Sequence, residues 1–187
     1  MKSKNLKKIV SLFLAFAIIA TVFFAVPNKV DAATTQVKTG VTLSNYKKAQ
    51  AVKLGTSKVI LCKNSSGTTK FVVPSTGTYV FKISNVSAPG KKLNGFVSFY
   101  TPVNYLQDLK GRTQGGTEDT LRVANSAFLS SWNKNNNYQK STPANERYLS
   151  YRTMKVKLTK GQKVYMSAFF AGAGTAKPSY ILKITKA

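Results

Sequence analysis

Hydrophobic and polar residues alternate in several short segments of this chain, which is the pattern of half-buried β-strands. In residues 79–83 the alternating apolar residues are Tyr, Phe and Ile, and in residues 154–158 Met, Val and Leu are separated by lysines. Successive side chains of a strand point to opposite faces, so one face enters a core and the other meets water. The pattern predicts strands at residues 69–73, 77–85, 95–101, 120–124, 154–158, 164–170 and 180–185.

Turn-forming residues separate these segments. Residues 74–77 (Pro-Ser-Thr-Gly) follow the first segment, and residues 159–162 (Thr-Lys-Gly-Gln) precede 164–170. Such residues favour tight turns. We expect the last three segments to form three antiparallel strands with one hydrophobic face.

Two regions lack a clear strand pattern. Residues 43–54 predict either a short helix or an irregular linker. The second region is residues 102–152, apart from the strand predicted at 120–124; its run 131–138 is rich in asparagine, and we interpret that run as a long surface loop.

The N-terminus has the pattern of a secretory signal peptide. Lysines within residues 2–8 precede an apolar run at 9–26, and small or modest residues at 30–32 suit signal peptidase. We expect cleavage between Ala32 and Ala33, with export by the general secretory route of a Gram-positive-like bacterium. An uncleaved membrane anchor is the alternative, because the apolar run is near the lower length limit for a span. The predicted organisation is a signal peptide at 1–32 and one secreted domain at 33–187.

The large positive net charge of the chain bears most directly on its function. The whole chain has 29 Lys and Arg against 5 Asp and Glu. Without residues 1–32 the formal charge is about +20, since five lysines and one aspartate belong to that segment. Such an excess opposes compaction by self-repulsion, which favours a polyanionic partner over mere solubility.

Cys62 is the one cysteine, so no disulfide can form within a chain. It follows the apolar residues 59–61, and we expect it to be buried as a small hydrophobic side chain. A reactive thiol or an intermolecular bridge is the less favoured alternative.

Two sequence stretches resemble the bacterial pre-peptidase C-terminal type of β-sandwich domain. They are residues 68–84, of the form F-x-V-P-x-x-G-x-Y-x-F, and residues 154–185, with L-x-K-G-Q-x-x-Y before a final Y-x-L-x-I strand. The matching positions are Phe71, Pro74, Gly77, Tyr79, Phe81, Leu158, Gly161, Gln162, Tyr165, Tyr180, Leu182 and Ile184. The resemblance implies a non-catalytic accessory domain, usually attached to a secreted enzyme. It implies no ligand-binding residues, because the matched positions belong to core and turns.

The composition excludes several kinds of catalysis. The chain has no histidine, which rules out Ser-His-Asp and Cys-His catalysis and histidine-bound metals. We expect no metal or other cofactor, since no acidic cluster has the spacing of a calcium loop. A carboxylate pair of the glycosidase kind could come from Glu118, Asp119 and Glu146. The alternative is that Glu118 and Asp119 form a charged turn and Glu146 pairs with Arg147.

Four lysines fall on the outward phase of predicted strands: Lys82, Lys155, Lys157 and Lys183. If their strands are neighbours in one sheet, the ammonium groups form a basic face suited to non-stereospecific contacts with anions. We therefore predict a polyanion-binding site there. Outward lysines also protect sheets from edge aggregation, which is the structural alternative.

Aromatic residues near the asparagine-rich run form a second candidate site. Trp132, Tyr138, Tyr148 and Tyr151 lie near Lys134, Lys140, Arg147 and Arg152. Aromatic rings among basic and amide groups suit stacking on sugars or on bases of single-stranded nucleic acid. The alternative is that they pack a long loop against the sheet.

We interpret the chain as a secreted, all-β, jelly-roll-like β-sandwich, without catalytic activity, that adsorbs to an anionic polymer such as teichoic acid or acidic polysaccharide. We expect it to be retained on the cell wall; nucleic acid is a less favoured partner. The other hypotheses are a secreted antagonist acting on anionic membranes and a small hydrolase of wall glycan.

Overall fold

The computed structural model describes residues 34–102, 120–133, 141–143 and 146–187. Residues 34–187 belong to one compact unit. The expected signal peptide and its cleavage site lie outside the described residues and stay predictions. Within the described ranges, no helix combines the length and the apolar character that crossing a membrane requires.

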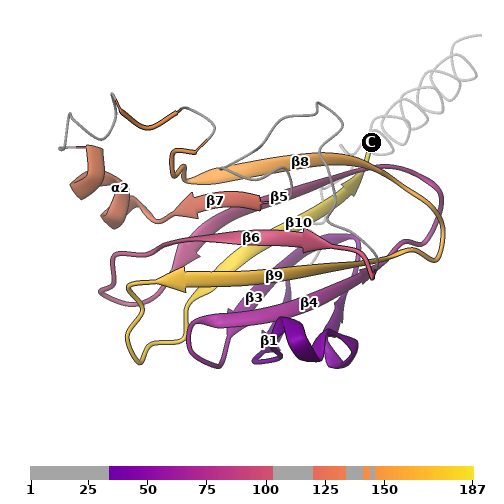
Figure 1. Ribbon diagram of the computed structural model, residues 1–187, viewed down its shortest axis with the longest axis horizontal. Helices are drawn as coiled ribbons and strands as arrows, with labels where there is room; N and C mark the ends of the chain where they lie inside the picture. Colours follow the sequence, from indigo (N-terminus) through magenta and orange to yellow (C-terminus); the bar gives the residue numbers. More distant parts are fainter. Residues whose placement is uncertain (1–33, 103–119, 134–140, 144–145) are drawn as a thin grey trace, which may run out of the picture. The chain divides into compact units, whose positions relative to one another are not determined.

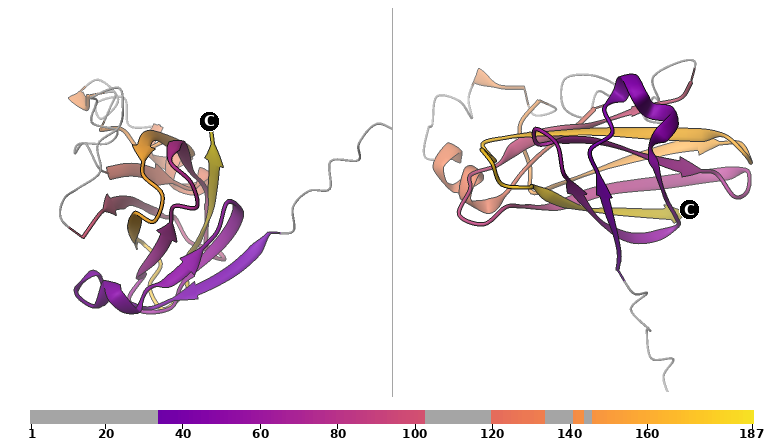
Figure 2. Two further views of the ribbon diagram at one scale, coloured as in Figure 1. Left: turned by 90° about the vertical axis from the view of Figure 1, so that its right-hand side faces the viewer. Right: turned by 90° about the horizontal axis from the view of Figure 1, so that it is seen from below.

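The described residues form two five-stranded sheets packed face to face (Figures 1 and 2). Sheet A has the order β1 (Thr35–Thr39), β3 (Gly55–Leu61), β10 (Ser179–Lys186), β5 (Gly77–Ser87) and β8 (Tyr151–Leu158). Sheet B has the order β2 (Gln50–Val52), β4 (Ser66–Val72), β9 (Lys163–Ala171), β6 (Asn94–Tyr100) and β7 (Thr120–Ala124). Two short helices accompany these strands: the 3-10 helix η1 (Leu43–Lys48) and α2 (Ser126–Asn133).

Strands β3 to β10 have the topology of a jelly roll. The chain passes repeatedly from one sheet to the other, so that β3, β10, β5 and β8 face β4, β9, β6 and β7. All pairs among these eight strands are antiparallel. This confirms the predicted antiparallel jelly-roll-like sandwich. Strands β1 and β2 extend it by pairing in parallel with β3 and β4.

The expected sheet of the last three strands is wrong. β9 belongs to sheet B, whereas β8 and β10 lie on either side of β5 in sheet A. Alternation shows which side chains of a strand are buried, but it does not show which sheet the strand joins. The turn at 159–162 therefore crosses between the sheets, as does the turn at 74–77.

These two crossing turns bind each other at one end of the sandwich. The backbone N–H of Gly161 donates to the Val73 carbonyl at 2.8 Å, and that of Val73 donates to the Gln162 carbonyl at 3.0 Å. The N–H of Lys160 donates to Thr76 Oγ1 at 3.0 Å. Gly161 has φ 81°, a conformation that favours glycine. The turn residues read from the sequence thus join the two sheets.

Three local expectations have definite outcomes. Residues 43–54 contain η1 followed by β2, rather than a linker without structure. Residues 131–133 belong to α2, so the surface loop expected at 131–138 is wrong in its first part, while 134–138 lie outside the described residues. Burial of Cys62 is also wrong, because its side chain is exposed. Leu61 ends β3 on the inward phase, so the next side chain points outward.

Aromatic rings from both sheets interlock in the core. Phe71 of sheet B packs edge-on against Tyr79 and Phe81 of sheet A, with ring centroids 5.6 and 5.9 Å apart. Phe81 in turn packs edge-on against Phe99 of sheet B at 5.4 Å. All four rings are buried. Edge-to-face pairs add stabilisation beyond the burial of area, so these rings hold the two layers together.

Tyr180 of β10 is fully buried in this core, beside Phe170. Burial raises the pKa of Tyr180 well above its ordinary value, and the neighbouring Thr69 hydroxyl opposes only part of that rise. A tyrosine in the unfolded chain ionises near pH ~10. The stability contributed by neutral Tyr180 is therefore fully present below about pH 10 and is lost as the pH rises above it.

We expect the free energy of unfolding to fall more steeply above about pH 10 in the wild type than in Tyr180→Phe, by up to ~1.4 kcal/mol per pH unit. The reason is that unfolding releases the proton that the buried phenol retains. Urea unfolding at a series of pH values measures this. All other titratable groups are the same in both proteins, so the difference between the curves isolates Tyr180. Parallel curves would contradict the assignment.

Candidate functional site

Lysines occupy the outer face of sheet A on all five strands. Inward residues of this sheet, such as Phe81, Met154 and Leu182, enter the core, so the alternate residues point away from it. We call the outward set the lysine stripe; its members are Lys38, Lys58, Lys183, Lys82, Lys155 and Lys157. All are exposed except Lys82, which is partly buried. The four lysines singled out from the sequence therefore share one face, and two further lysines extend it.

The middle of the lysine stripe places two like charges directly opposite each other. Lys183 on β10 is in register with Lys82 on β5. Directly opposed side chains have Cβ atoms about 5 Å apart, and like charges in such pairs are destabilising. This part of the sheet therefore carries an electrostatic cost that the fold itself does not require.

The other lysines continue from this pair in diagonal steps. Lys58 is opposite Ile181, two residues before Lys183, and Lys155 is opposite Val80, two residues before Lys82. Diagonal neighbours on a sheet are about 7–8 Å apart. Lys157 follows Lys155 on the same strand, and Lys38 is opposite Ile60 on β3. The stripe thus runs obliquely across the sheet in steps of roughly 5–8 Å, within the ~8–10 Å Debye length of physiological salt.

Tyr151 lies on the same face as the lysine stripe. It is opposite Ser84 in the register of β5 and β8, and its side chain is 54% exposed. The Nζ atom of Lys82 lies 4.7 Å from the centroid of the Tyr151 ring. An aromatic ring beside the ammonium groups gives this face an apolar contact surface as well as charge.

Two other aromatic residues of the second candidate site, Trp132 and Tyr148, pack against Phe128. Trp132 stacks on Phe128 at 4.9 Å, and Tyr148 packs edge-on against Phe128 at 5.6 Å. The structure therefore brings Trp132 and Tyr148 together around Phe128, while Tyr151 is the first residue of β8 and contacts Lys82. Tyr138 lies outside the described residues, as do Lys134 and Lys140.

Two arginines near this cluster support the local chain. Arg147 Nε donates to the Thr142 carbonyl at 2.8 Å. Arg152 is 8% exposed and donates to the carbonyls of Arg122 and Arg147. Burial, and secondly the charge of Arg122, lowers the pKa of Arg152. Arg152 thus links β8 to β7 and to the segment before β8.

The candidate carboxylate pair is only partly described. Glu146 lies within the described ranges, whereas Glu118 and Asp119 do not. Among the described residues no group of three His, Cys, Asp or Glu side chains could hold a metal ion. The hydrolase hypothesis therefore stays a prediction that these residues do not test.

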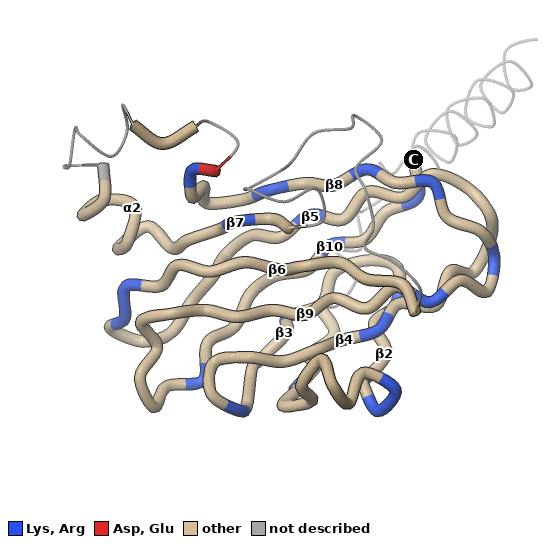
Figure 3. The backbone as a smooth tube through the Cα atoms, viewed as in Figure 1, with Lys and Arg blue, Asp and Glu red and all other residues tan. Residues whose placement is uncertain are grey.

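Basic residues are not confined to the lysine stripe. Figure 3 shows Lys and Arg on β8, β5 and β10 and also in turns and loops at the ends of strands. Lys47, Lys92 and Lys177 are exposed examples outside the strands. What distinguishes the stripe is its rigid backbone and its regular spacing. The outward position of Lys58 could have been predicted from the sequence. Lys58 directly precedes the apolar Val59, and successive side chains of a strand point to opposite faces.

Asn125 fixes the start of the helix that carries Trp132. Its Oδ1 accepts hydrogen bonds from the N–H groups of Phe128 at 2.9 Å and Leu93 at 3.0 Å. Its Nδ2 donates to the Lys91 carbonyl at 2.8 Å. The side chain therefore caps α2 and ties it to the loop before β6.

No protein-family model matches the sequence, and the search of curated proteins found no match. Among solved structures, the chain is similar to the pre-peptidase C-terminal domain of a collagenase from Bacillus anthracis. The identity is 11% and the TM-score 0.38, covering 74% of this chain and 95% of that one. It is also similar to CorA, a surface-associated copper-binding protein of Methylomicrobium album BG8. The identity is 6% and the TM-score 0.38, covering 74% of this chain and 98% of that one. The resemblance noted in the sequence is thus found again in the structure comparison, and at these values it carries no argument about function.

We expect Asn125→Ala to lower the free energy of unfolding by roughly 1–3 kcal/mol, because it removes a cap and leaves backbone groups without partners. Trp132 is the only tryptophan, so its fluorescence reports the packing of α2 during urea unfolding. Ser126→Ala, an exposed neighbour, is the control and should change stability by less than ~0.5 kcal/mol. Equal effects of the two substitutions would show that Asn125 does not anchor the helix.

Proposed function

We propose that this chain is a secreted, non-catalytic binding domain that adsorbs to linear anionic polymers of the cell envelope, such as teichoic acid or an acidic polysaccharide. The observation that carries the proposal is the lysine stripe across the outer face of sheet A. Its central pair, Lys82 and Lys183, opposes like charges in register. An anion bound between the two ammonium groups attracts both of them and so offsets their mutual repulsion.

The spacing of the stripe favours a polymer over a single ion. Successive lysines are roughly 5–8 Å apart on a backbone that the sheet holds rigid. Each ammonium group is a compact, strongly hydrated charge on a flexible stem, so it contacts anions without strict geometry. Several such contacts made together release counterions from both surfaces, and affinity then falls steeply as salt rises.

The exposed ring of Tyr151 supports a ligand that has apolar groups beside its anionic groups. Its exposed ring lies beside Lys82, where it can contact the apolar face of a sugar or a glycerol unit next to an anionic group. The absence of histidine from the whole sequence supports binding rather than acid–base catalysis. The predicted signal peptide supports a location where envelope polymers are accessible.

We expect the triple variant Lys82→Gln, Lys155→Gln and Lys183→Gln to bind immobilised glycerol-phosphate teichoic acid at least about tenfold more weakly than the wild type. The plot of log affinity against log salt concentration should become shallower, with the magnitude of its negative slope reduced by about three, or ~1 for each anion contact that is lost. Surface plasmon resonance at several salt concentrations measures both quantities.

The matched control removes the same charge elsewhere, with Lys47→Gln, Lys92→Gln and Lys177→Gln. Because net charge is equal in the two variants, only the stripe variant should lose most of the affinity. If both lose affinity equally, binding depends on diffuse charge and the stripe has no special role. Capture by anionic lipid vesicles but not by the polymer would favour the membrane antagonist instead.

A further inference from the structure

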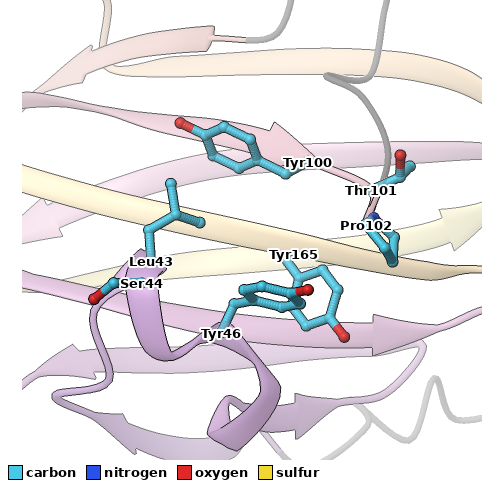
Figure 4. Close-up of a pocket in the computed structure, with 7 residues that line it drawn as sticks. All are labelled: Leu43, Ser44, Tyr46, Tyr100, Thr101, Pro102 and Tyr165. Carbon is cyan, nitrogen blue, oxygen red and sulfur yellow. The ribbon is translucent and has the colours of Figure 1, made fainter.

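A cavity of about 360 Å³ lies on the side of sheet B that faces away from the core. Seven residues line it: Leu43, Ser44, Tyr46, Tyr100, Thr101, Pro102 and Tyr165 (Figure 4). Its volume is near the lower end for ligand pockets, which suits one small ring rather than a long chain. The lysine stripe is on the other sheet, so the cavity is independent of the proposed polyanion site.

Three segments far apart in the sequence bring the tyrosines together. Tyr165 on β9 is directly opposite Tyr100 on β6 in the register of sheet B. Helix η1 contributes Tyr46, whose ring packs edge-on against Tyr165 with centroids 4.8 Å apart at 77°. In Figure 4, Tyr46 and Tyr165 lie together and Tyr100 lies across the cavity from them. The cavity therefore offers ring faces in different orientations.

The chemistry of the lining suits an uncharged polar ligand. None of the seven residues is charged, and five of them carry hydroxyl groups. A tyrosine phenol is protonated at neutral pH and can donate a hydrogen bond. Burial, and secondly the neighbouring Tyr46, raises the pKa of Tyr165 further. Aromatic faces with hydroxyl groups at their edges match a sugar ring, which has apolar C–H faces and polar edges.

Two apolar residues of the cavity lining, Leu43 and Pro102, favour a sugar that carries an apolar substituent. Leu43 and Pro102 flank the tyrosines from opposite sides (Figure 4). They provide apolar contacts at the rim, where a simple hexose would present only hydroxyl groups. An N-acetyl group has a methyl group that fits such a contact and an amide that can bind the neighbouring hydroxyls of Ser44 or Thr101.

We propose that this cavity binds an N-acetylated amino sugar of a neutral glycan. Tyr46 and Tyr100 provide stacking surfaces, and Leu43 or Pro102 contacts the acetyl methyl group. Aromatic grooves also bind extended proline-rich peptides. Such a peptide requires an elongated groove, whereas this cavity is flanked by Leu43 on one side and Pro102 on the other.

The test is titration calorimetry of the purified protein with the tetrasaccharide of N-acetylglucosamine, with the tetrasaccharide of glucose as the matched sugar without acetyl groups. We expect the acetylated sugar to bind at least about fivefold more tightly. Tyr46→Ala and Tyr100→Ala should each weaken its binding roughly tenfold. Binding should be unchanged between 50 and about 500 mM salt, since no ion pair is involved.

Tyr151→Ala, on the other sheet, is the control variant and should retain full affinity for the sugar. Thermal melts of both cavity variants test that they remain folded, and Tyr100→Phe provides a milder change that keeps the ring.

Absence of sugar binding by the wild type, or equal binding by all variants, would overturn the proposal. Equal affinity for the two sugars would overturn the N-acetyl assignment, and binding of a proline-rich peptide alone would assign the cavity to that ligand class. The polymer measurements on the lysine stripe are unaffected by any of these results.

Discussion

The facing hydrophobic surfaces of the two sheets determine where every other side chain of the sandwich lies. Phe71 and Phe99 from one sheet interlock with Tyr79 and Phe81 from the other. Because side chains alternate along a strand, burying these rings forces their neighbours in sequence onto the outer faces. A shift of one residue in register would carry the lysines into the core and expose the aromatic rings.

This constraint gives the lysine stripe its rigidity. Lys82 lies between the buried Phe81 and Ile83, and Lys155 lies between Met154 and Val156. Their backbone cannot move without disturbing the core, so the points on the sheet from which the lysine side chains project keep their spacing when no ligand is bound. Repulsion between charges held in place in this way costs stability, whereas a bound polyanion would relieve it. Preorganised charge of this kind suits binding of a repeating polymer.

The two outer faces have different chemistry. The outer face of sheet A carries lysines and one exposed tyrosine, whereas the cavity on sheet B is lined by uncharged aromatic, aliphatic and hydroxyl-bearing residues. A sandwich keeps such surfaces apart by the thickness of its core. If both proposals hold, the domain binds an anionic polymer on one side and a neutral glycan on the other, and linking two weak contacts raises the overall affinity.

The sequence by itself determined the positions of most strands, the outward phase of the lysines and the excess of positive charge, because alternation and composition are local properties. Only the tertiary structure decided that β8, β9 and β10 divide between two sheets, since strand pairing depends on backbone hydrogen bonds between distant segments. The same reason explains why Lys38 joined the stripe and why Tyr46, Tyr100 and Tyr165 came together. The exposure of Cys62 was also missed, because a continuous apolar run does not show which of its alternate residues face the core.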